Sequence, residues 1–296
     1  MDYKNCRFCA RLCGVDRTAG EIGFCGMSAV PHVARAALHH WEEPPISGTR
    51  GSGTVFFSGC SLGCVFCQNS DISRGISGLA VTEERIAEMM LELEEAGAHN
   101  INFVTPTHFL PSVRGAIILA KGQGLKLPIV YNTGSYDTVE ALKSLDGLVD
   151  IYLPDFKYLR RMTAAKYSSA PDYPDVARAA IAEMVRQRGA VVIEDGIMKS
   201  GVIVRVLLLP SHTAEAKLCV KYLFDTYGDT VYISLMNQYT PMKGMPPPLD
   251  RTVTHEEYSS LVDYAVKKGI ENAFIQEWGT AKESFIPPFD NTGVQK

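Results

Sequence analysis

Short apolar runs alternate with longer amphipathic stretches over most of the chain. The apolar runs are rich in β-branched and aromatic residues, and turn-forming residues bound them, which is typical of buried strands. The stretches between them place apolar residues at helical spacing. The clearest of these begins at Thr82, a favourable N-cap, and ends at Gly97. The predicted strands are residues 54–57, 100–104, 127–131, 149–153, 202–209, 230–235 and 272–276.

This alternation predicts an α/β fold. The connections between strands are long enough for crossover helices, so the sheet should be parallel with helices outside it. Seven such strands indicate a partial, open β/α barrel over residues 54–296. Residues 1–53 should form a small N-terminal, cysteine-rich, metal-binding segment. Barrels of this kind place their chemistry at the C-terminal ends of the strands.

Three cysteines follow directly on the first predicted strand. Cys60, Cys64 and Cys67 have the spacing C-x3-C-x2-C on the loop that leaves its C-terminal end. Three thiols this close together cannot all pair as disulfides, whereas thiolates at such spacing suit zinc or an iron-sulfur cluster. A closed zinc site takes four ligands, and no fourth Cys or His lies near this loop. A purely structural metal knuckle is the alternative to a functional cluster.

A second cysteine group lies at the N-terminus. Cys6, Cys9, Cys13 and Cys25 have the spacing C-x2-C-x3-C-x11-C. Together they would complete a closed site for a structural zinc or for an auxiliary iron-sulfur cluster, and free structural thiols are the alternative. Apolar residues are few in this segment, so its folding is expected to depend on the metal. The eighth cysteine, Cys219, is expected to be a buried core thiol.

Composition narrows the classes of function. The 296 residues carry a net charge of −4 without a basic stripe, which argues against a nucleic acid as the principal partner. No apolar run approaches the length of a membrane span, and the first residues show no secretory hydrophobic region. We therefore expect a cytoplasmic globular protein with reduced cysteines. The adjacent His39 and His40 are expected to be a surface pair.

The cysteine loop resembles the signature of the radical S-adenosylmethionine (SAM) family, C-x3-C-x-aromatic-C, with Phe66 in the aromatic slot. The resemblance implies a 4Fe-4S cluster held by Cys60, Cys64 and Cys67. In that family the open iron binds the amino and carboxylate groups of SAM. An electron from the cluster then splits SAM into methionine and a 5′-deoxyadenosyl radical. The protein orients the cofactor and excludes water.

The same resemblance assigns residues after the second and third strands. Thr105 and Thr107 follow residues 100–104, where radical SAM enzymes usually carry a glycine-rich segment with an acidic residue that holds the amino group of SAM. Hydroxyl groups stand in its place here. Asn132 ends the third strand in a segment similar to the polar Thr-Asn-Gly segment of glycyl-radical activating enzymes.

Two further strand ends complete the implied cofactor site. Asp155 and Lys157 resemble the Asp-Leu-Lys motif of the activating enzymes, and such a charge pair suits the carboxylate and ribose of SAM. A surface ion pair is the alternative. His212 stands at a strand end where the activating enzymes also carry a histidine. The residues implied to bind the cofactor are Phe66, Thr105, Thr107, Asn132, Asp155, Lys157 and His212.

The exit of the sixth strand offers candidates for substrate contact. Asn237, Gln238 and Tyr239 make it unusually polar, although an ordinary turn would also explain them. A radical enzyme also needs a dry cavity, and aromatic side chains are candidates for its walls, with core packing as the alternative. These side chains are Phe66, Phe109, Tyr152 and Trp278.

As a whole, the chain resembles the radical SAM branch related to pyruvate formate-lyase activating enzymes, in particular members with an added N-terminal cysteine cluster. The resemblance implies reductive cleavage of SAM and abstraction of a hydrogen atom from a glycine of a partner glycyl-radical enzyme. The electron donor would be a protein such as flavodoxin or ferredoxin. Two alternatives stay open. One is a radical SAM enzyme that acts on a small molecule or another macromolecule. The other is a metal-stabilised binding protein without turnover.

Overall fold

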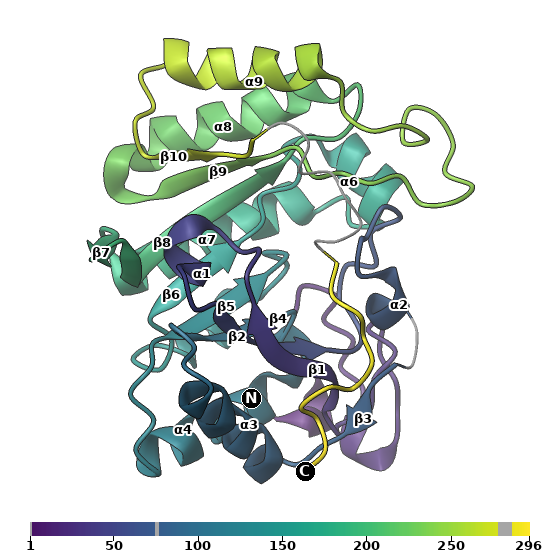
Figure 1. Cartoon of the computed structure of the whole chain (residues 1–296). Helices are drawn as coiled ribbons and strands as arrows, with labels where there is room; N and C mark the ends of the chain where they lie inside the picture. The colour runs from purple at the N-terminus through teal and green to yellow at the C-terminus, as the bar shows by residue number, and fades with distance from the viewer. Residues whose placement is uncertain (1, 75–76, 278–285) are drawn as a thin grey trace.

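A computed structural model of the chain describes residues 2–74, 77–277 and 286–296. Its main feature is an open mixed sheet (Figure 1). In this described part the strand order is β10-β9-β8-β6-β5-β4-β2-β1-β3, and β7 pairs with β8. The strands are β1 (His32–His39), β2 (Ser52–Phe57), β3 (Leu79–Ala80), β4 (Ile101–Val104), β5 (Ile129–Thr133), β6 (Ile151–Pro154), β7 (Val192–Glu194), β8 (Ile197–Leu207), β9 (Tyr232–Met236) and β10 (Ala273–Ile275).

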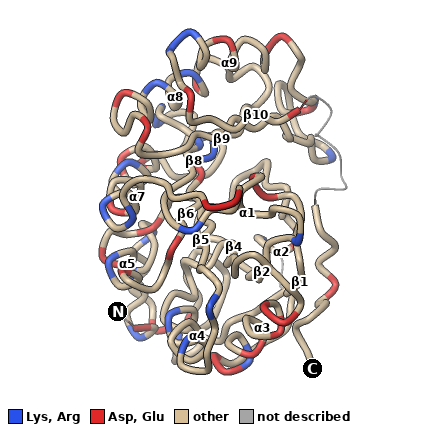
Figure 2. The backbone as a smooth tube through the Cα atoms, turned by 60° about the vertical axis from the view of Figure 1, so that its left-hand side comes forward, with Lys and Arg blue, Asp and Glu red and all other residues tan. Residues whose placement is uncertain are grey.

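Helices connect the strands and cover the outside of the sheet. Among the longer ones, α3 packs on α4, α5 packs on α7, and α8 packs on α9. Figure 2 shows acidic and basic residues interspersed along these helices. The helices are α1 (Pro44–Ser47), α2 (Ser70–Ser73), α3 (Glu83–Glu95), α4 (Leu110–Gly122), α5 (Val139–Lys143), α6 (Arg161–Ser168), α7 (Tyr173–Arg188), α8 (Thr213–Tyr227) and α9 (His255–Lys267). Among the described residues, none of these helices is long and apolar enough to cross a membrane.

The predicted parallel sheet is confirmed. Strands β2, β4, β5, β6, β8, β9 and β10 correspond to the predicted runs, and each neighbouring pair among them is parallel. The sequence missed β1, which pairs antiparallel with β2, as well as β3 and β7. Strand β1 is rich in alanine, which has a low β-propensity, so its pairing with β2 decides its conformation. The predicted domain boundary at residue 53 stays a prediction.

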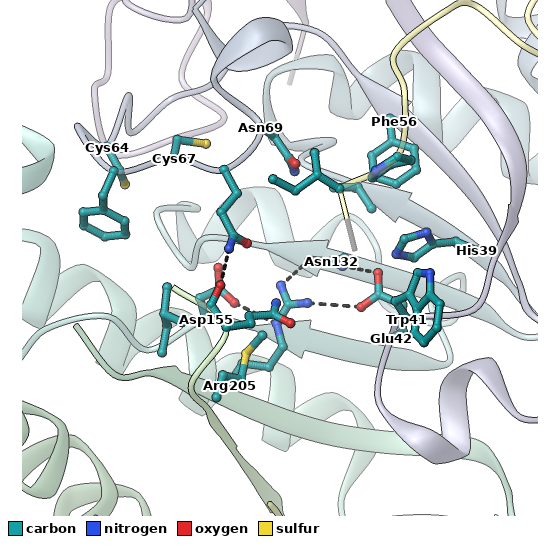
Figure 3. A pocket seen from close by; sticks show the side chains of 18 of the residues that line it. His39, Trp41, Glu42, Phe56, Cys64, Cys67, Asn69, Asn132, Asp155 and Arg205 are labelled. Carbon is teal, nitrogen blue, oxygen red and sulfur yellow. Dashed lines mark hydrogen bonds and ion pairs between the residues drawn. The ribbon is translucent and has the colours of Figure 1, made fainter. Parts of the chain in front are cut away.

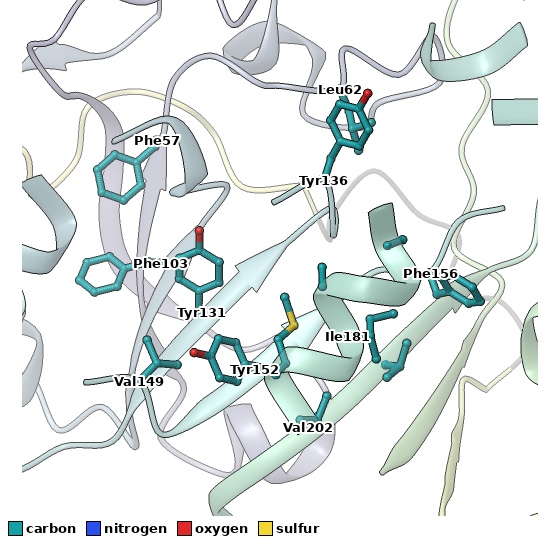
Figure 4. Packing of buried hydrophobic residues seen from close by; sticks show 14 of the residues in the cluster. Phe57, Leu62, Phe103, Tyr131, Tyr136, Val149, Tyr152, Phe156, Ile181 and Val202 are labelled. Carbon is teal, nitrogen blue, oxygen red and sulfur yellow. The ribbon is translucent and has the colours of Figure 1, made fainter. Parts of the chain in front are cut away.

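The two faces of the parallel strands differ, because successive side chains point to opposite sides. Tyr131, Tyr152 and Val202 face outward and pack under the helices (Figure 4). Their neighbours Val130, Ile151, Leu153 and Ile203 face inward and pack around Ile46 of α1. Helix α1 therefore closes one end of the barrel interior. The C-terminal ends of the strands, at the other end, are left to form a site.

The C-terminal segment, residues 286–296, runs beside β1 (Figure 1). The backbone N–H of Ala36 donates to Thr292 O at 2.8 Å, and that of Asn291 donates to Ala34 O at 2.9 Å. Phe289 packs on Phe56. The C-terminal segment therefore packs against β1 and the end of β2 on one side of the barrel.

Candidate active site

The loop of Cys60, Cys64 and Cys67 leaves the C-terminal end of β2, as the sequence predicted. Two of its sulfur atoms accept hydrogen bonds. The hydroxyl of Ser168 donates to Cys64 Sγ at 3.0 Å, and the N–H of Leu62 donates to Cys60 Sγ at 3.4 Å. Burial, together with the nearby Cys64 and Cys67, raises the pKa of Cys60 to about 12. A bound metal group would replace the protons that the thiols of Cys60 and Cys64 otherwise keep.

The donor set of this loop fits an iron-sulfur cluster. It supplies soft thiol ligands, and donors from Leu62 and Ser168 already point at the sulfurs, as is typical around such clusters. In the described part of the chain, no three His, Cys, Asp or Glu side chains are arranged to hold a single metal ion. A four-iron cluster differs from a single ion in this respect, because it binds its thiolates at separate iron atoms.

A cavity of about 190 Å³ opens beside the cysteine loop (Figure 3). Cys64 and Cys67 lie on one side of it, and polar side chains from several strands form its floor. Because the carboxyl ends of parallel strands meet at one edge of a sheet, residues distant in sequence converge here. The described residues at its lining include Glu42, Phe66, Gln68, Asn69, Asn132, Asp155, Lys157, Arg205, Met236 and Gln238.

Arg205 of β8 is the centre of a charged network in this cavity. Its Nε donates to Asp155 Oδ1 at 2.7 Å, its Nη1 to Glu42 Oε2 at 3.2 Å, and its Nη2 to Asn132 Oδ1 at 2.6 Å. Lys157 Nζ donates to Asp155 Oδ2 at 2.6 Å. Charges of opposite sign therefore alternate from Lys157 through Asp155 and Arg205 to Glu42 (Figure 3).

The network keeps Asp155 ionised. Burial acts to raise the pKa of its carboxyl, but Arg205 and Lys157 outweigh that effect and lower the pKa below its usual range. For Lys157, burial acts to lower the pKa, and the charge of Asp155 reverses this, so the pKa is raised. Both groups are therefore charged at neutral pH. They line the cavity with side chains that are 23% (Asp155) and 15% (Lys157) exposed, so the alternative of a surface ion pair does not apply.

The structure brings together some of the predicted cofactor residues. Phe66, Asn132, Asp155 and Lys157 line the cavity with Cys64 and Cys67. The other three lie outside its lining. Thr105 has φ 57° at the end of β4, Thr107 donates to Asp137 Oδ1 at 2.8 Å, and His212 Nε2 lies 3.1 Å from the hydroxyl of Tyr167.

Of the residues predicted to contact substrate or to form the cavity walls, some line the cavity and others lie outside it. Gln238 lines the cavity, whereas the backbone N–H of Asn237 donates to Gln276 and the hydroxyl of Tyr239 donates to Leu249 O. Phe109 and Tyr152 are core residues that pack against other aromatic rings outside the lining. Trp278 lies outside the described residues. Cys219 is buried, as predicted.

Sequence reasoning missed two residues of the network and misplaced one histidine. Arg205 is a lone charge within an apolar strand, which is a signal for a buried ion pair. Glu42 belongs to an acidic pair that precedes the first predicted strand. The sequence around this pair does not predict a strand. The surface location predicted for His39 is wrong: β1 brings this side chain to the cavity, and burial lowers its pKa to about 4. His40 is exposed.

The N-terminal cysteine segment lies directly behind the cysteine loop. Gly59 has φ 87°, and a Cβ there would lie 2.9 Å from Cys25 O, so both the conformation and the close approach require glycine. Burial, together with the charges of Cys25, Cys6 and Cys13, raises the pKa of Cys9 to about 12. The four predicted ligands therefore act on one another, but among the described residues they are not arranged to hold a single metal ion. Their metal stays a prediction.

Arg11 joins the two cysteine segments. Its guanidinium donates to Ser61 O of the cysteine loop at 2.9 Å and to Ser168 O at 2.9 Å, and it lies 3.7 Å from the ring centroid of Phe24.

We expect Arg11→Ala to reduce the free energy of unfolding by about 2 kcal/mol. We also expect it to speed the loss of iron from the loaded protein to a chelator. The control is Arg7→Ala, which removes an exposed contact to Asn5. Equal iron retention by both variants would contradict this role.

Glu43 is a second buried acid beside the network. Burial raises its pKa to about 7, against the opposing effect of Arg205, and the charge of Glu42 adds to the rise. A raised carboxyl pKa means that its contribution to stability is complete below about pH 4.5 and is lost as the pH rises through about 7. Glu43→Gln should therefore raise Tm by a few degrees at pH 8, at roughly 2 to 4 °C per kcal/mol, and hardly at all at pH 5. Scanning calorimetry at both pH values measures this, and an equal shift at both would contradict it.

Comparison with known proteins identifies the class of this site. The profile of the radical SAM superfamily matches residues 54–217, which include the cysteine loop, Asp155, Lys157 and Arg205. The chain therefore belongs to the radical SAM superfamily. The family implies a 4Fe-4S cluster and SAM as cofactors, in agreement with the donor set of the loop.

One curated relative and two solved structures add to this. An uncharacterized protein of Methanocaldococcus jannaschii is 31% identical over 283 residues, covering 91% of this chain and 76% of its own length. SuiB of Streptococcus suis, solved with bound S-adenosylmethionine, aligns with a TM-score of 0.53 at 11% identity over 75% of this chain. This chain covers 49% of SuiB. A radical SAM methyltransferase of Sphaerobacter thermophilus aligns with a TM-score of 0.53 at 16% identity. The alignment covers 75% of this chain and 66% of the methyltransferase. These two structures confirm the fold class.

Proposed function

We propose that this protein cleaves SAM reductively at a cluster held by Cys60, Cys64 and Cys67 and abstracts a hydrogen atom from a glycine of a partner glycyl-radical enzyme. The observation that carries the proposal is the convergence of the cysteine loop and the network of Asp155 and Lys157 on one cavity. When bound, the cluster supplies the single electron that splits SAM into methionine and the 5′-deoxyadenosyl group that takes up the hydrogen atom.

The residues of the chain bind and orient the reactants. Lys157, held by Asp155, offers a cation at the cavity beside Cys64. Burial raises the pKa of the Cys64 thiol, and the positive charge of Lys157 acts against this rise. Arg205 fixes Asp155 from the other side, so the carboxylate has one orientation. Phe66 packs edge-on against Tyr158, Tyr167 and Tyr239 behind the loop and keeps water away from it.

Carboxamide groups at the cavity support a peptide as the substrate. Gln68, Asn69 and Gln238 line it, and Gln276 holds the side chain of Gln238 at 2.9 Å. Carboxamides pair readily with the N–H and C=O groups of a main chain. The glycine itself is proposed from the resemblance to the activating enzymes. In the same proposal the protein works in the reducing cytoplasm, with flavodoxin or ferredoxin as electron donor. The free state of all its cysteines supports that location.

Electron paramagnetic resonance tests the glycine substrate. Anaerobically loaded protein is incubated with SAM, a reductant and each candidate glycyl-radical enzyme. We expect a protein radical on the partner in an amount equal to the 5′-deoxyadenosine released. Release of 5′-deoxyadenosine without a radical on any candidate would show that the substrate is a small molecule or another macromolecule.

We further propose that Cys6, Cys9, Cys13 and Cys25 hold a zinc ion or an auxiliary iron-sulfur cluster. The spacing C-x2-C-x3-C-x11-C supports it, and since the described side chains are not arranged around a single ion, the metal would have to order this segment when it binds. Metal analysis of a variant with Cys60, Cys64 and Cys67 all replaced reports this site alone. Retained zinc or iron identifies the metal, and a metal-free variant contradicts the proposal.

A further inference from the structure

The cysteine loop has a second side, outside the cavity. Cys64 and Cys67 line the cavity, whereas Gly63 lies outside its lining and is partly exposed. The ring of Phe24 lies over this glycine, since a Cβ at Gly63 would be 3.5 Å from Phe24 Cε1. SAM and the substrate would occupy the cavity side of the loop. The side of Gly63 is therefore left open for the supply of an electron to the cluster.

Three cations surround Gly63. Arg11 donates to the carbonyls of the two residues before it, at 2.9 and 3.3 Å. Arg74, which follows α2, donates to Gly63 O at 3.1 Å and to Cys64 O at 2.9 Å. Lys166 is exposed on α6, and the carbonyl of the next residue accepts a backbone N–H of the loop at 2.8 Å. The N-terminal segment, α2 and α6 thus bring three positive charges to one side of the molecule (Figure 1).

The bonds that hold these cations leave their charge unbalanced. Arg11 and Arg74 bond to main-chain carbonyls, and Lys166 Nζ lies 4.9 Å from the ring centroid of Tyr167. Carbonyl groups and a neutral ring carry no net charge. Arg74 and Lys166 are exposed, so they present their charge to solvent. In a chain with a net charge of −4 this is a local exception, and a positive patch attracts an acidic partner.

Exposed apolar side chains accompany the cations. Phe24 is half exposed above the loop, and Leu12, next to Arg11 in the chain, is exposed to a similar extent. Met162 of α6 is 85% exposed and lies one helical turn before Lys166, on the same side of the helix. A few apolar side chains among charged groups are typical of a protein interface. Interfaces of electron-transfer pairs are small and bury less than about 1,200 Å².

We propose that the outer side of the cysteine loop is a docking face for a small acidic electron-transfer protein. One electron leaves the reduced centre of this donor, which is thereby oxidised, and reduces the bound cluster, while no covalent bond forms or breaks. The inference rests on the proposed cleavage of SAM and names where its electron donor binds. The residues of this docking face are Leu12, Phe24 and Met162 together with Arg11, Arg74 and Lys166. The described lining of the cavity contains none of them, so donor and substrate can bind at the same time.

Calorimetric binding tests the docking face. The anaerobic, cluster-loaded protein is titrated with an acidic flavodoxin, with both proteins oxidised and SAM absent. We expect binding that weakens about tenfold when the salt concentration rises from about 50 to about 300 mM. At the lower salt concentration, Lys166→Glu should weaken it about tenfold. The control is Lys126→Glu, which changes an exposed lysine before β5, at the N-terminal ends of the strands, and should leave binding unchanged.

Carbodiimide coupling maps the contact, because it joins a lysine amine to a carboxylate that lies against it. We expect a crosslink between Lys166 and an acidic peptide of the flavodoxin. Flavodoxin that does not bind, that binds Lys166→Glu as tightly as the unchanged protein, or that crosslinks only to other lysines would overturn the proposal. So would self-association that Lys166→Glu abolishes, since the face would then join two copies of this chain.

Two further measurements separate this proposal from the proposed reaction. Near-ultraviolet circular dichroism shows that both variants are folded. Release of 5′-deoxyadenosine with dithionite as the electron source tests the cleavage of SAM without a protein donor. We expect Lys166→Glu to cleave SAM like the unchanged protein with dithionite, and about tenfold more slowly with reduced flavodoxin at low salt. An equal loss with both reductants would overturn the docking face.

Discussion

Cys60→Ala is expected to abolish the release of 5′-deoxyadenosine from SAM. The cluster needs a thiolate from each of the three loop cysteines, and the open iron must be the only one without a protein ligand. Loss of Cys60 removes a half-buried ligand whose sulfur accepts the N–H of Leu62. Among the described residues of the cavity lining, the cysteines are Cys64 and Cys67, and both are already used. The measurement is product analysis by chromatography after anaerobic reconstitution.

Cys219→Ala is the matched control for this variant. Cys219 is a buried free thiol on α8, and it packs in the core away from the cavity. Its replacement should cost about 1 kcal/mol of stability and leave SAM cleavage intact. Cleavage by Cys60→Ala at the rate of the control would show that the loop does not hold the reactive cluster.

Arg205→Met has the second largest expected effect. It removes the cation that pairs with Asp155 and Glu42 and leaves two largely desolvated carboxylates without it, with 23% and 8% of their side chains exposed. Breaking a buried pair by removing one partner costs about 3 to 5 kcal/mol, so the free energy of unfolding should fall by that amount. SAM cleavage should fall at least about 100-fold, because Asp155 loses the contact that orients it. Urea unfolding and product analysis measure the two effects.

Two further variants show whether this effect is specific. Arg205→Lys keeps the charge but loses the planar fork, so it should recover part of the stability and less of the activity. Arg161→Gln removes an exposed arginine that pairs with the exposed Asp175, and it should cost less than about 0.5 kcal/mol. In Arg205→Met the pKa of Asp155 should rise, so its activity should decline at a higher pH than that of the unchanged protein as the pH falls. An unchanged pH profile would contradict the role of Arg205.

The order of strands and helices along the chain made both the parallel sheet and part of the site predictable from the sequence. Alternating strands and crossover helices allow few arrangements, and all parallel strands present their carboxyl ends at one edge. Asn132, Asp155 and Lys157 stand at such ends, so their convergence with the cysteine loop followed from topology.

The rest depended on tertiary structure. Strand β1 has little strand propensity and forms through pairing with β2, so the position of Glu42 in the cavity could not be foreseen. Arg205 was visible as a charge in an apolar strand, but its partners depend on the register of β8 beside β6. Thr105 and Thr107 stand at a strand end, yet the chain turns there with a positive φ at Thr105, and Thr107 bonds to Asp137 instead.

Anaerobic reconstitution of the unchanged protein tests the central claim most directly. The protein is supplied with iron and sulfide, and then with SAM and a one-electron reductant. We predict uptake of a 4Fe-4S cluster at Cys60, Cys64 and Cys67 and release of methionine and 5′-deoxyadenosine in equal amounts. Zinc bound at these cysteines, or a loaded cluster that leaves SAM intact, would contradict the account.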